Sequence, residues 1–192
     1  MAHEVCWPAH PVRAAVQTIS PLSDRRWHEF VQKCEASSVF HTREWLEALR
    51  RTYDYEPIVF TTSPPGAAIE NGLVLCRVNS WLTGDRLVSV PFSDHCDPLG
   101  PRDETQLLFT AAEQEVSRGG VRYFEMRPKH PIELNTSLLQ ASFSYSYHHI
   151  DLRPDLSTLF GNCHKDSTQR KIRRAEREGL RYEEGESQAL LD

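Results

Sequence analysis

The sequence predicts a mixed α/β fold of the α+β kind, in which helices flank a mainly antiparallel sheet. Stretches with the two-residue alternation of strands are interspersed with stretches whose apolar residues recur at helical spacing. A short loop with a glycine, Thr83-Gly84-Asp85, joins two of the strands and predicts an antiparallel hairpin. A helix between two later strands predicts a β-α-β crossover, so a mixed sheet is favoured over a doubly wound parallel one.

A short strand and a helix are expected near the start of the chain. Residues 15–19 alternate with period two, and Pro21 follows them. A helix is expected over residues 24–33, with Ser23 as the residue that caps its first turn. The inner face of this helix is expected to carry three apolar side chains, Trp27, Phe30 and Val31.

A second helix is expected to begin after Thr42, whose hydroxyl can accept a hydrogen bond from the first helical turn. Its inner stripe is expected to hold four residues at helical spacing, Trp45, Leu46, Leu49 and Tyr53. The chain then becomes rich in β-forming residues. Three strands are expected in this part, over residues 56–62, 72–81 and 86–91.

A long polar connection over residues 93–102, with two prolines and a glycine, separates this β-rich part from the next helix. That helix is expected over residues 103–118, and Gly119-Gly120 is expected to end it. Two more strands are expected, over residues 121–127 and 145–152, where alternation and aromatic residues return.

The last predicted helix runs from Asp166, its candidate N-cap, to about Glu178, and Gly179 is expected to end it. Gln169 lies three residues after Asp166, which is the spacing of a capping box. At 100° per residue, one face of this helix collects four arginines, Arg170, Arg173, Arg174 and Arg177, with Lys171 beside them.

Charge is segregated along the chain. The formal net charge is −5, from 22 Lys and Arg against 27 Asp and Glu. The segment from Lys165 to Arg177 has six basic and two acidic residues, a net charge of +4, so the rest of the chain carries −9. Such an acidic remainder argues against DNA binding, which usually requires a broad basic surface. No apolar run approaches the ~20 residues of a membrane-spanning helix.

The basic stripe allows three interpretations. It can be an ordinary solvated helix face, with the arginine charges relieved by neighbouring glutamates. It can bind a phosphate or pyrophosphate, because guanidinium groups match phosphate oxygens in pairs. It can also contact a nucleic acid, for which transfer RNA held by a local patch is the form compatible with the acidic remainder.

The loop Ser93-Asp94-His95-Cys96-Asp97 gathers two carboxylates, an imidazole and a thiol within five residues. His95 can act as a general base near neutral pH. The alternative is a structural turn in which Asp94 and Asp97 bond their own backbone. A zinc site is disfavoured, because the spacing is irregular and the only residues that could complete it are distant, namely His148, His149, Cys163 and His164. We therefore expect no metal.

The five cysteines are odd in number and widely spaced, without a C-x-x-C pair. This pattern argues against a disulfide framework and indicates a reducing, cytoplasmic location. Each cysteine is expected to be a small buried apolar residue. The five positions are Cys6, Cys34, Cys76, Cys96 and Cys163.

Three segments, in order, resemble the FemAB-like aminoacyl and acyl transferases, which are built from tandem domains of the GNAT acetyltransferase fold. The first, residues 40–46, reads Phe-His-Thr-Arg-Glu-Trp-Leu and looks like an early helix of that family. The second is the hairpin of residues 72–89 with the following Val-Pro-Phe-Ser-Asp, and the third is the basic segment 167–180. The loop departs from the family in having His95-Cys96-Asp97 where Tyr-Gly-Gly is frequent.

The resemblance implies a GNAT-like domain over residues 14–179. Residues 1–13, with Pro8 and Pro11, are expected to be a flexible lead-in. Residues 180–192 then resemble the first strand and the start of a second, truncated GNAT-like domain. The family transfers an aminoacyl or acyl group to an amine, often in peptidoglycan precursors. The chain is therefore expected to be the acceptor-binding half of such an enzyme, with catalytic residues that stay unknown. Whether this half is active alone is left open by the sequence.

The resemblance also suggests ligands. A nucleotide- or lipid-linked pyrophosphate acceptor would lie against the basic stripe, with Asp94, His95 and Asp97 lining the cleft, and a membrane-borne precursor would bring peripheral membrane contact. Acyl-CoA or aminoacyl-tRNA would be the donor substrate, and no resident cofactor is evident. Two alternatives remain open. One is a noncatalytic, stand-alone binding module, and the other is an adaptor that binds transfer RNA.

Overall fold

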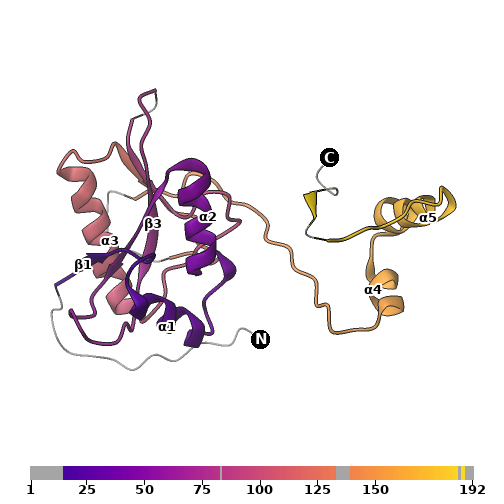
Figure 1. Ribbon diagram of the computed structural model, residues 1–192, viewed down its shortest axis with the longest axis horizontal. Coiled ribbons are helices and arrows are strands. Elements are labelled where there is room, and N and C mark those ends of the chain that lie inside the picture. The colour runs from indigo at the N-terminus through magenta and orange to yellow at the C-terminus, as the bar shows by residue number, and fades with distance from the viewer. Residues whose placement is uncertain (1–14, 83, 133–138, 186, 189–192) are drawn as a thin grey trace. The chain divides into compact units, whose positions relative to one another are not determined.

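The computed structural model describes residues 15–188, apart from residues 83, 133–138 and 186. The chain divides into two compact units, one ending at Ser144 and the other beginning at Tyr145 (Figure 1). Each unit is described by itself below. The predicted lead-in of residues 1–13 lies outside the described residues. Among the described residues no helix is long and apolar enough to cross a membrane.

The first unit is built on a five-stranded sheet with the strands in chain order, β1-β2-β3-β4-β5. The first four strands pair antiparallel with one another, and β5 joins β4 in parallel. The predicted mixed, mainly antiparallel sheet is therefore confirmed. The strands are β1 (Gln17–Ile19), β2 (Glu56–Thr61), β3 (Leu73–Val78), β4 (Arg86–Val88) and β5 (Tyr123–Glu125).

Helices cover both faces of this sheet (Figure 1). The helices α1 (Arg25–Lys33) and α2 (Arg43–Tyr53) pack on one face, and a short 3₁₀ turn, η1 (Val39–His41), lies between them in the chain. The helix α3 (Arg102–Ser117) packs on the other face and makes the crossover from β4 to β5. The predicted β-α-β crossover is thus confirmed, and it explains why the β4–β5 pair is parallel.

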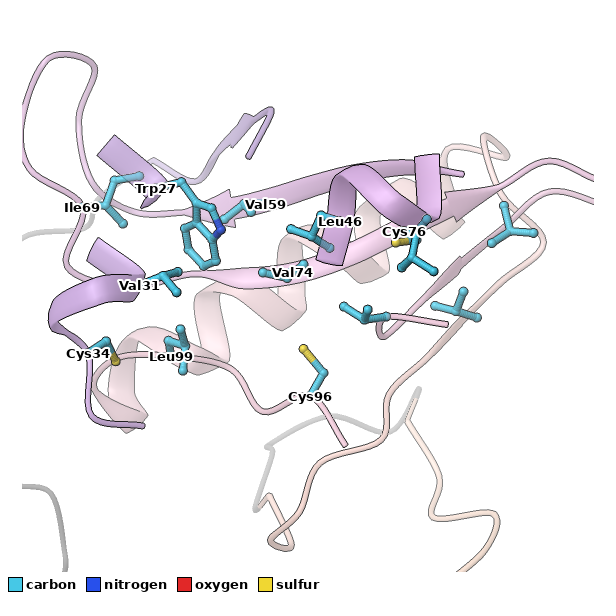
Figure 2. Close-up of a cluster of buried hydrophobic side chains, with 14 residues drawn as sticks. Trp27, Val31, Cys34, Leu46, Val59, Ile69, Val74, Cys76, Cys96 and Leu99 are labelled. Carbon is cyan, nitrogen blue, oxygen red and sulfur yellow. The ribbon is translucent and has the colours of Figure 1, made fainter. Parts of the chain in front are cut away.

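Alternation along the strands separates two cores. In β3, Val74 and Cys76 face α1 and α2, whereas Leu73 and Leu75 face α3. Figure 2 shows the first core, in which helix side chains such as Trp27 lie against the strands and Cys96 and Leu99 lie near the core from their loop. From Leu73 to Cys76 the strand β3 is buried on both sides, which is why these residues are all apolar rather than alternating with polar ones.

Several strands are shorter than predicted because prolines and polar residues end the pairing. The predicted strand 86–91 pairs only as far as Val88, where the chain turns towards Pro91. The predicted strand 121–127 pairs only over Tyr123–Glu125. The strand predicted over residues 145–152 is wrong, because this exposed segment forms no strand. The second unit, to which the segment belongs, has no strand among its described residues.

The start of α1 differs by one residue from the prediction. Asp24, not Ser23, is the N-cap, and its carboxylate accepts a hydrogen bond from the Arg26 backbone N–H at 3.0 Å. The same carboxylate pairs with the Arg26 guanidinium. The predicted Thr42 cap of α2 is confirmed, with its hydroxyl accepting from the Trp45 N–H at 3.4 Å.

The second unit contains α4 (Leu156–Asn162) and a basic helix made of the π-helical turn η2 (Lys165–Gln169) and α5 (Arg170–Arg177). His164, rather than the predicted Asp166, caps this helix by accepting from the Ser167 N–H at 3.3 Å. Gln169 does not complete a capping box. Its side chain is buried and donates to the Gly161 and Cys163 carbonyl oxygens, which ties the helix to the end of α4.

The predicted end of the basic helix at Gly179 is confirmed. Gly179 has a φ of +65°, a conformation that favours glycine. The N–H groups of Gly179 and Leu180 donate to the carbonyls of Glu176 and Ala175, which is the double hydrogen bond of a Schellman motif.

Candidate functional site

The loop after β4 and the chain after β5 lie together because parallel strands bring their carboxyl ends to the same edge of the sheet. Three hydrogen bonds join them. The Ser89 N–H donates to the Glu125 carbonyl at 2.8 Å, and the Cys96 N–H donates to the Arg127 carbonyl at 2.9 Å. The Lys129 N–H donates to the Asp97 carboxylate at 2.9 Å. The predicted site loop is therefore a fixed part of the sheet edge.

His95 and Asp97 lie beside each other in this loop. The His95 Nδ1 atom is 3.3 Å from an Asp97 carboxylate oxygen, a contact that is not aligned as a hydrogen bond, and both side chains are about three-quarters or more buried. The Phe40 ring meets the His95 ring edge to face, with centroids 5.6 Å apart. Asp97 does not form the expected local turn, because its other oxygen accepts from the distant Lys129 N–H. Asp94 is exposed on the same loop.

His41 lies under the loop and was not among the predicted site residues. The side chain is only 1% exposed. The Ser38 N–H donates to its Nδ1 at 3.1 Å, so the proton is on Nε2, which lies 2.9 Å from the Asp97 carbonyl oxygen and donates to it. The sequence signal for this arrangement is the Ser38–His41 spacing, which is that of a capping box with His in place of Glu or Gln.

Cys96 is a packing residue rather than a nucleophile. Its Sγ lies 3.4 Å from His41 Nε2, a distance at which a cysteine and a histidine can form a catalytic pair. However, Cys96 is buried, and burial raises the pKa of its thiol far above the ordinary value. A nucleophile would need a lowered pKa and access to substrate.

The other cysteines follow the same pattern. Cys34 and Cys76 are buried as predicted, and burial raises the pKa of each thiol. Cys163 is half-buried, so the expectation of full burial is wrong there, and Cys6 lies outside the described residues.

Acidification is expected to destabilise the first unit through His41. Burial lowers the pKa of His41 below its ordinary value of 6.5, against smaller opposing effects of its hydrogen bond to Asp97 and the Asp97 charge. The unfolded chain therefore takes up a proton at a higher pH than the folded chain does. The contribution of the neutral, buried His41 to the free energy of unfolding is fully present above about pH 6.5, and it is lost as the pH falls below that value.

Urea denaturation at pH 7.5, 6.5 and 5.5 measures this loss. The variant His41→Gln, whose amide can both donate and accept, should show a smaller fall in unfolding free energy than the wild type. The neighbouring titratable groups Asp97 and His95 are retained in that variant, so their contribution cancels. An equal fall in both proteins would show that His41 does not cause the effect.

The basic stripe lies on α5, and all five predicted cations, Arg170, Lys171, Arg173, Arg174 and Arg177, are exposed. Two of them have local partners. The Arg173 guanidinium lies 5.3 Å from the centroid of the Phe160 ring, and Arg174 pairs with Glu178 at 2.6 Å. Arg170, Lys171 and Arg177 form no ion pair with any described residue. These three are thus the cations with the most freedom to meet a ligand.

The loop belongs to the first unit and the basic stripe to the second. That they line one cleft therefore remains a prediction. Among the described residues no three His, Cys, Asp or Glu side chains are grouped so that they could hold a metal ion. His148 and His149 are exposed, and His164 is engaged as a helix cap.

No family model, curated protein or solved structure matches this chain.

Proposed function

We propose that this chain carries the acceptor-binding part of an enzyme that transfers an acyl or aminoacyl group to an amine. The observation that carries the proposal is the His95–Asp97 pair at the carboxyl ends of β4 and β5. The buried His41 stabilises this loop by donating a hydrogen bond to the Asp97 carbonyl. A mixed sheet with helices on both faces is also the fold that the FemAB-like resemblance implies.

The pair suits proton removal from an attacking amine. With Asp97 beside Nδ1, the His95 ring can keep its proton there and offer Nε2 as a base. The amine nitrogen would form a bond to the carbonyl carbon of the donor, and its proton would pass to Nε2 as the donor's leaving group departs. Asp97 is itself held by the Lys129 N–H, so its carboxylate is in place beside the His95 ring before the substrate arrives.

The basic stripe would hold the acceptor's pyrophosphate, whether the acceptor is linked to a nucleotide or to a membrane lipid. Arg170 and Arg177 are seven residues apart, so they lie on the same face of the helix, and neither forms an ion pair with a described residue. Guanidinium groups bind phosphate oxygens in pairs, which makes these two arginines the principal expected contacts. Lys171 would add a third charge.

The variant Arg170→Ala/Arg177→Ala tests the stripe. Titration calorimetry with UDP-N-acetylmuramoyl pentapeptide should show binding weakened by about tenfold or more, since each lost contact is charge-assisted. The control Arg25→Ala/Arg51→Ala removes the same charge from two exposed arginines that pair with Glu29 and Glu47 in the first unit. It should leave the affinity within about twofold of the wild type.

Equal affinity in the wild type and the stripe variant would remove the stripe from the acceptor site. Titration of the wild-type protein with transfer RNA tests the adaptor alternative. Phosphate contacts would give an affinity for transfer RNA that falls steeply as the salt concentration rises. Tight, salt-dependent binding of transfer RNA without binding of the muropeptide would favour that alternative. Muropeptide binding with no turnover from any acyl-CoA or aminoacyl-tRNA would favour a noncatalytic module.

A further inference from the structure

Three aromatic rings gather on the first unit where α2 ends and where β4 ends. Tyr53 is the last residue of α2, Tyr55 precedes β2, and Phe92 follows β4. The Tyr53 and Tyr55 rings are stacked, with centroids 5.4 Å apart and planes at 20°. The Tyr53 and Phe92 centroids are 4.7 Å apart, with planes at 35°. We call Tyr53, Tyr55 and Phe92 the aromatic shelf.

Two of the three shelf rings, Tyr53 and Phe92, are open to solvent, and Tyr55 is half-buried against the core. Helical spacing predicts that Tyr53 is buried on the inner stripe of α2, but its side chain is 48% exposed. Phe92 is 60% exposed. Apolar rings of this size usually lie inside a protein, and an exposed group of them marks a surface with a binding role.

The backbone at the shelf is strained. Phe92 and Asp54 are the two residues other than glycine with a positive φ in the described chain, at 62° and 56°. Asp54 lies between the two tyrosines, and aspartate tolerates this conformation at the end of a helix. Phe92 is in the third position of a turn closed by a hydrogen bond from the Ser93 N–H to the Val90 carbonyl at 3.2 Å, where glycine is ordinarily required.

Neither burial nor local backbone preference explains a phenylalanine at this position. A bulky residue held in an unfavourable conformation is a sign of function when the surrounding structure enforces it. Here Pro91 occupies the second position of the turn, and the Ser93 hydroxyl reinforces it by also donating to the Val90 carbonyl at 2.6 Å. The turn therefore holds the Phe92 ring against Tyr53 with one side available to a ligand.

The charges beside the shelf indicate which ligand fits. Two exposed aspartates lie close to the shelf along the chain. Asp54 lies between Tyr53 and Tyr55, and Asp94 follows Phe92 by two residues. Their carboxylates accept hydrogen bonds from hydroxyl groups and repel phosphate. A pyranose ring combines a flat face of C–H groups, which pack on aromatic rings, with a rim of hydroxyl donors.

We propose that the aromatic shelf binds the flat face of a neutral saccharide ring. Asp54 and Asp94 would accept hydrogen bonds from hydroxyl groups at the rim of the ring. The assignment uses only residues of the first unit and does not depend on the transferase proposal. A sugar bound here would need no phosphate for recognition.

Saturation-transfer NMR with chitotetraose tests the shelf in the intact chain. We expect the ring C–H protons to receive saturation, and we expect Phe92→Gly to weaken the binding by about tenfold. Glycine adopts a φ of +62° without strain, so this variant should melt no lower than the wild type. A fall in binding would then reflect the lost ring. Trp81→Ala, which removes another exposed aromatic ring of the first unit, should leave binding unchanged.

Two results would overturn the proposal. One is the absence of chitotetraose binding, or binding that is equal in the wild type and in Phe92→Gly. The other is Phe92-dependent binding of uridine in place of the sugar, which would make the shelf a nucleobase site. Because chitotetraose has no phosphate, failure of this test leaves the muropeptide affinity of α5 unaffected. Chitotetraose binding together with a muropeptide affinity that the Arg170→Ala/Arg177→Ala variant leaves unchanged would instead leave the shelf standing and count against the transferase proposal.

Discussion

Replacing Trp27 with alanine is expected to destabilise the first unit by about 3–5 kcal/mol, enough to unfold a large fraction of a domain of ordinary stability. Trp27 is the largest of the fully buried side chains and packs between α1 and the sheet (Figure 2). Its Nε1–H also donates to the His41 carbonyl at 3.0 Å. The variant therefore creates a cavity and removes a buried hydrogen bond at once.

Urea denaturation followed by far-UV circular dichroism measures the Trp27→Ala effect without relying on tryptophan fluorescence. Trp81→Ala is the matched control, because the Trp81 side chain is 96% exposed. It should change the unfolding free energy by no more than about 0.5 kcal/mol. A similar midpoint for both variants would mean that Trp27 does not anchor the core.

Replacing His41 with alanine is expected to cost about 2–4 kcal/mol and to loosen the site loop. The variant leaves the Ser38 N–H and the Asp97 carbonyl without their buried partner, and each unpaired group costs about 1–3 kcal/mol. It also removes a contact with the Cys96 sulfur. Because Asp97 carries the carboxylate beside His95, the predicted base would lose its fixed position.

Hydrogen exchange measured by mass spectrometry separates this local effect from global destabilisation. Peptides that cover residues 93–97 should exchange faster in His41→Ala, at urea concentrations where the β3 peptides remain protected. His28→Ala is the control, since His28 is a less buried histidine of α1 whose bond is to the exposed Gln32 side chain. Unchanged exchange at residues 93–97 would show that His41 does not hold the loop.

The sheet and its covering helices could be predicted from the sequence because their signals are local. Alternation, the Thr42 cap and the Gly179 stop each depend on residues a few positions apart. The strand predicted over residues 145–152 fails for a related reason. Alternation records which side chains are apolar, but a strand also needs a neighbour to pair with, and the described residues of the second unit include no strand.

The candidate site was predicted only in part. The sequence brings His95 and Asp97 to attention because they are two residues apart. It gives no sign that Asp97 bonds the Lys129 N–H, since that contact depends on the parallel pairing of β4 with β5. The contact of His41 with the loop spans more than fifty residues and was missed for the same reason.

The sequence by itself determined the fold class, the hairpin, the crossover and the concentration of positive charge on one helix. These follow from the spacing of apolar residues and from composition, which act locally along the chain. Only the tertiary structure decided that Tyr53 is exposed against Phe92, that His41 supports the loop and that Cys96 is a buried, unreactive thiol. Each of these depends on which distant segments the folded sheet places in contact, and on the burial that results.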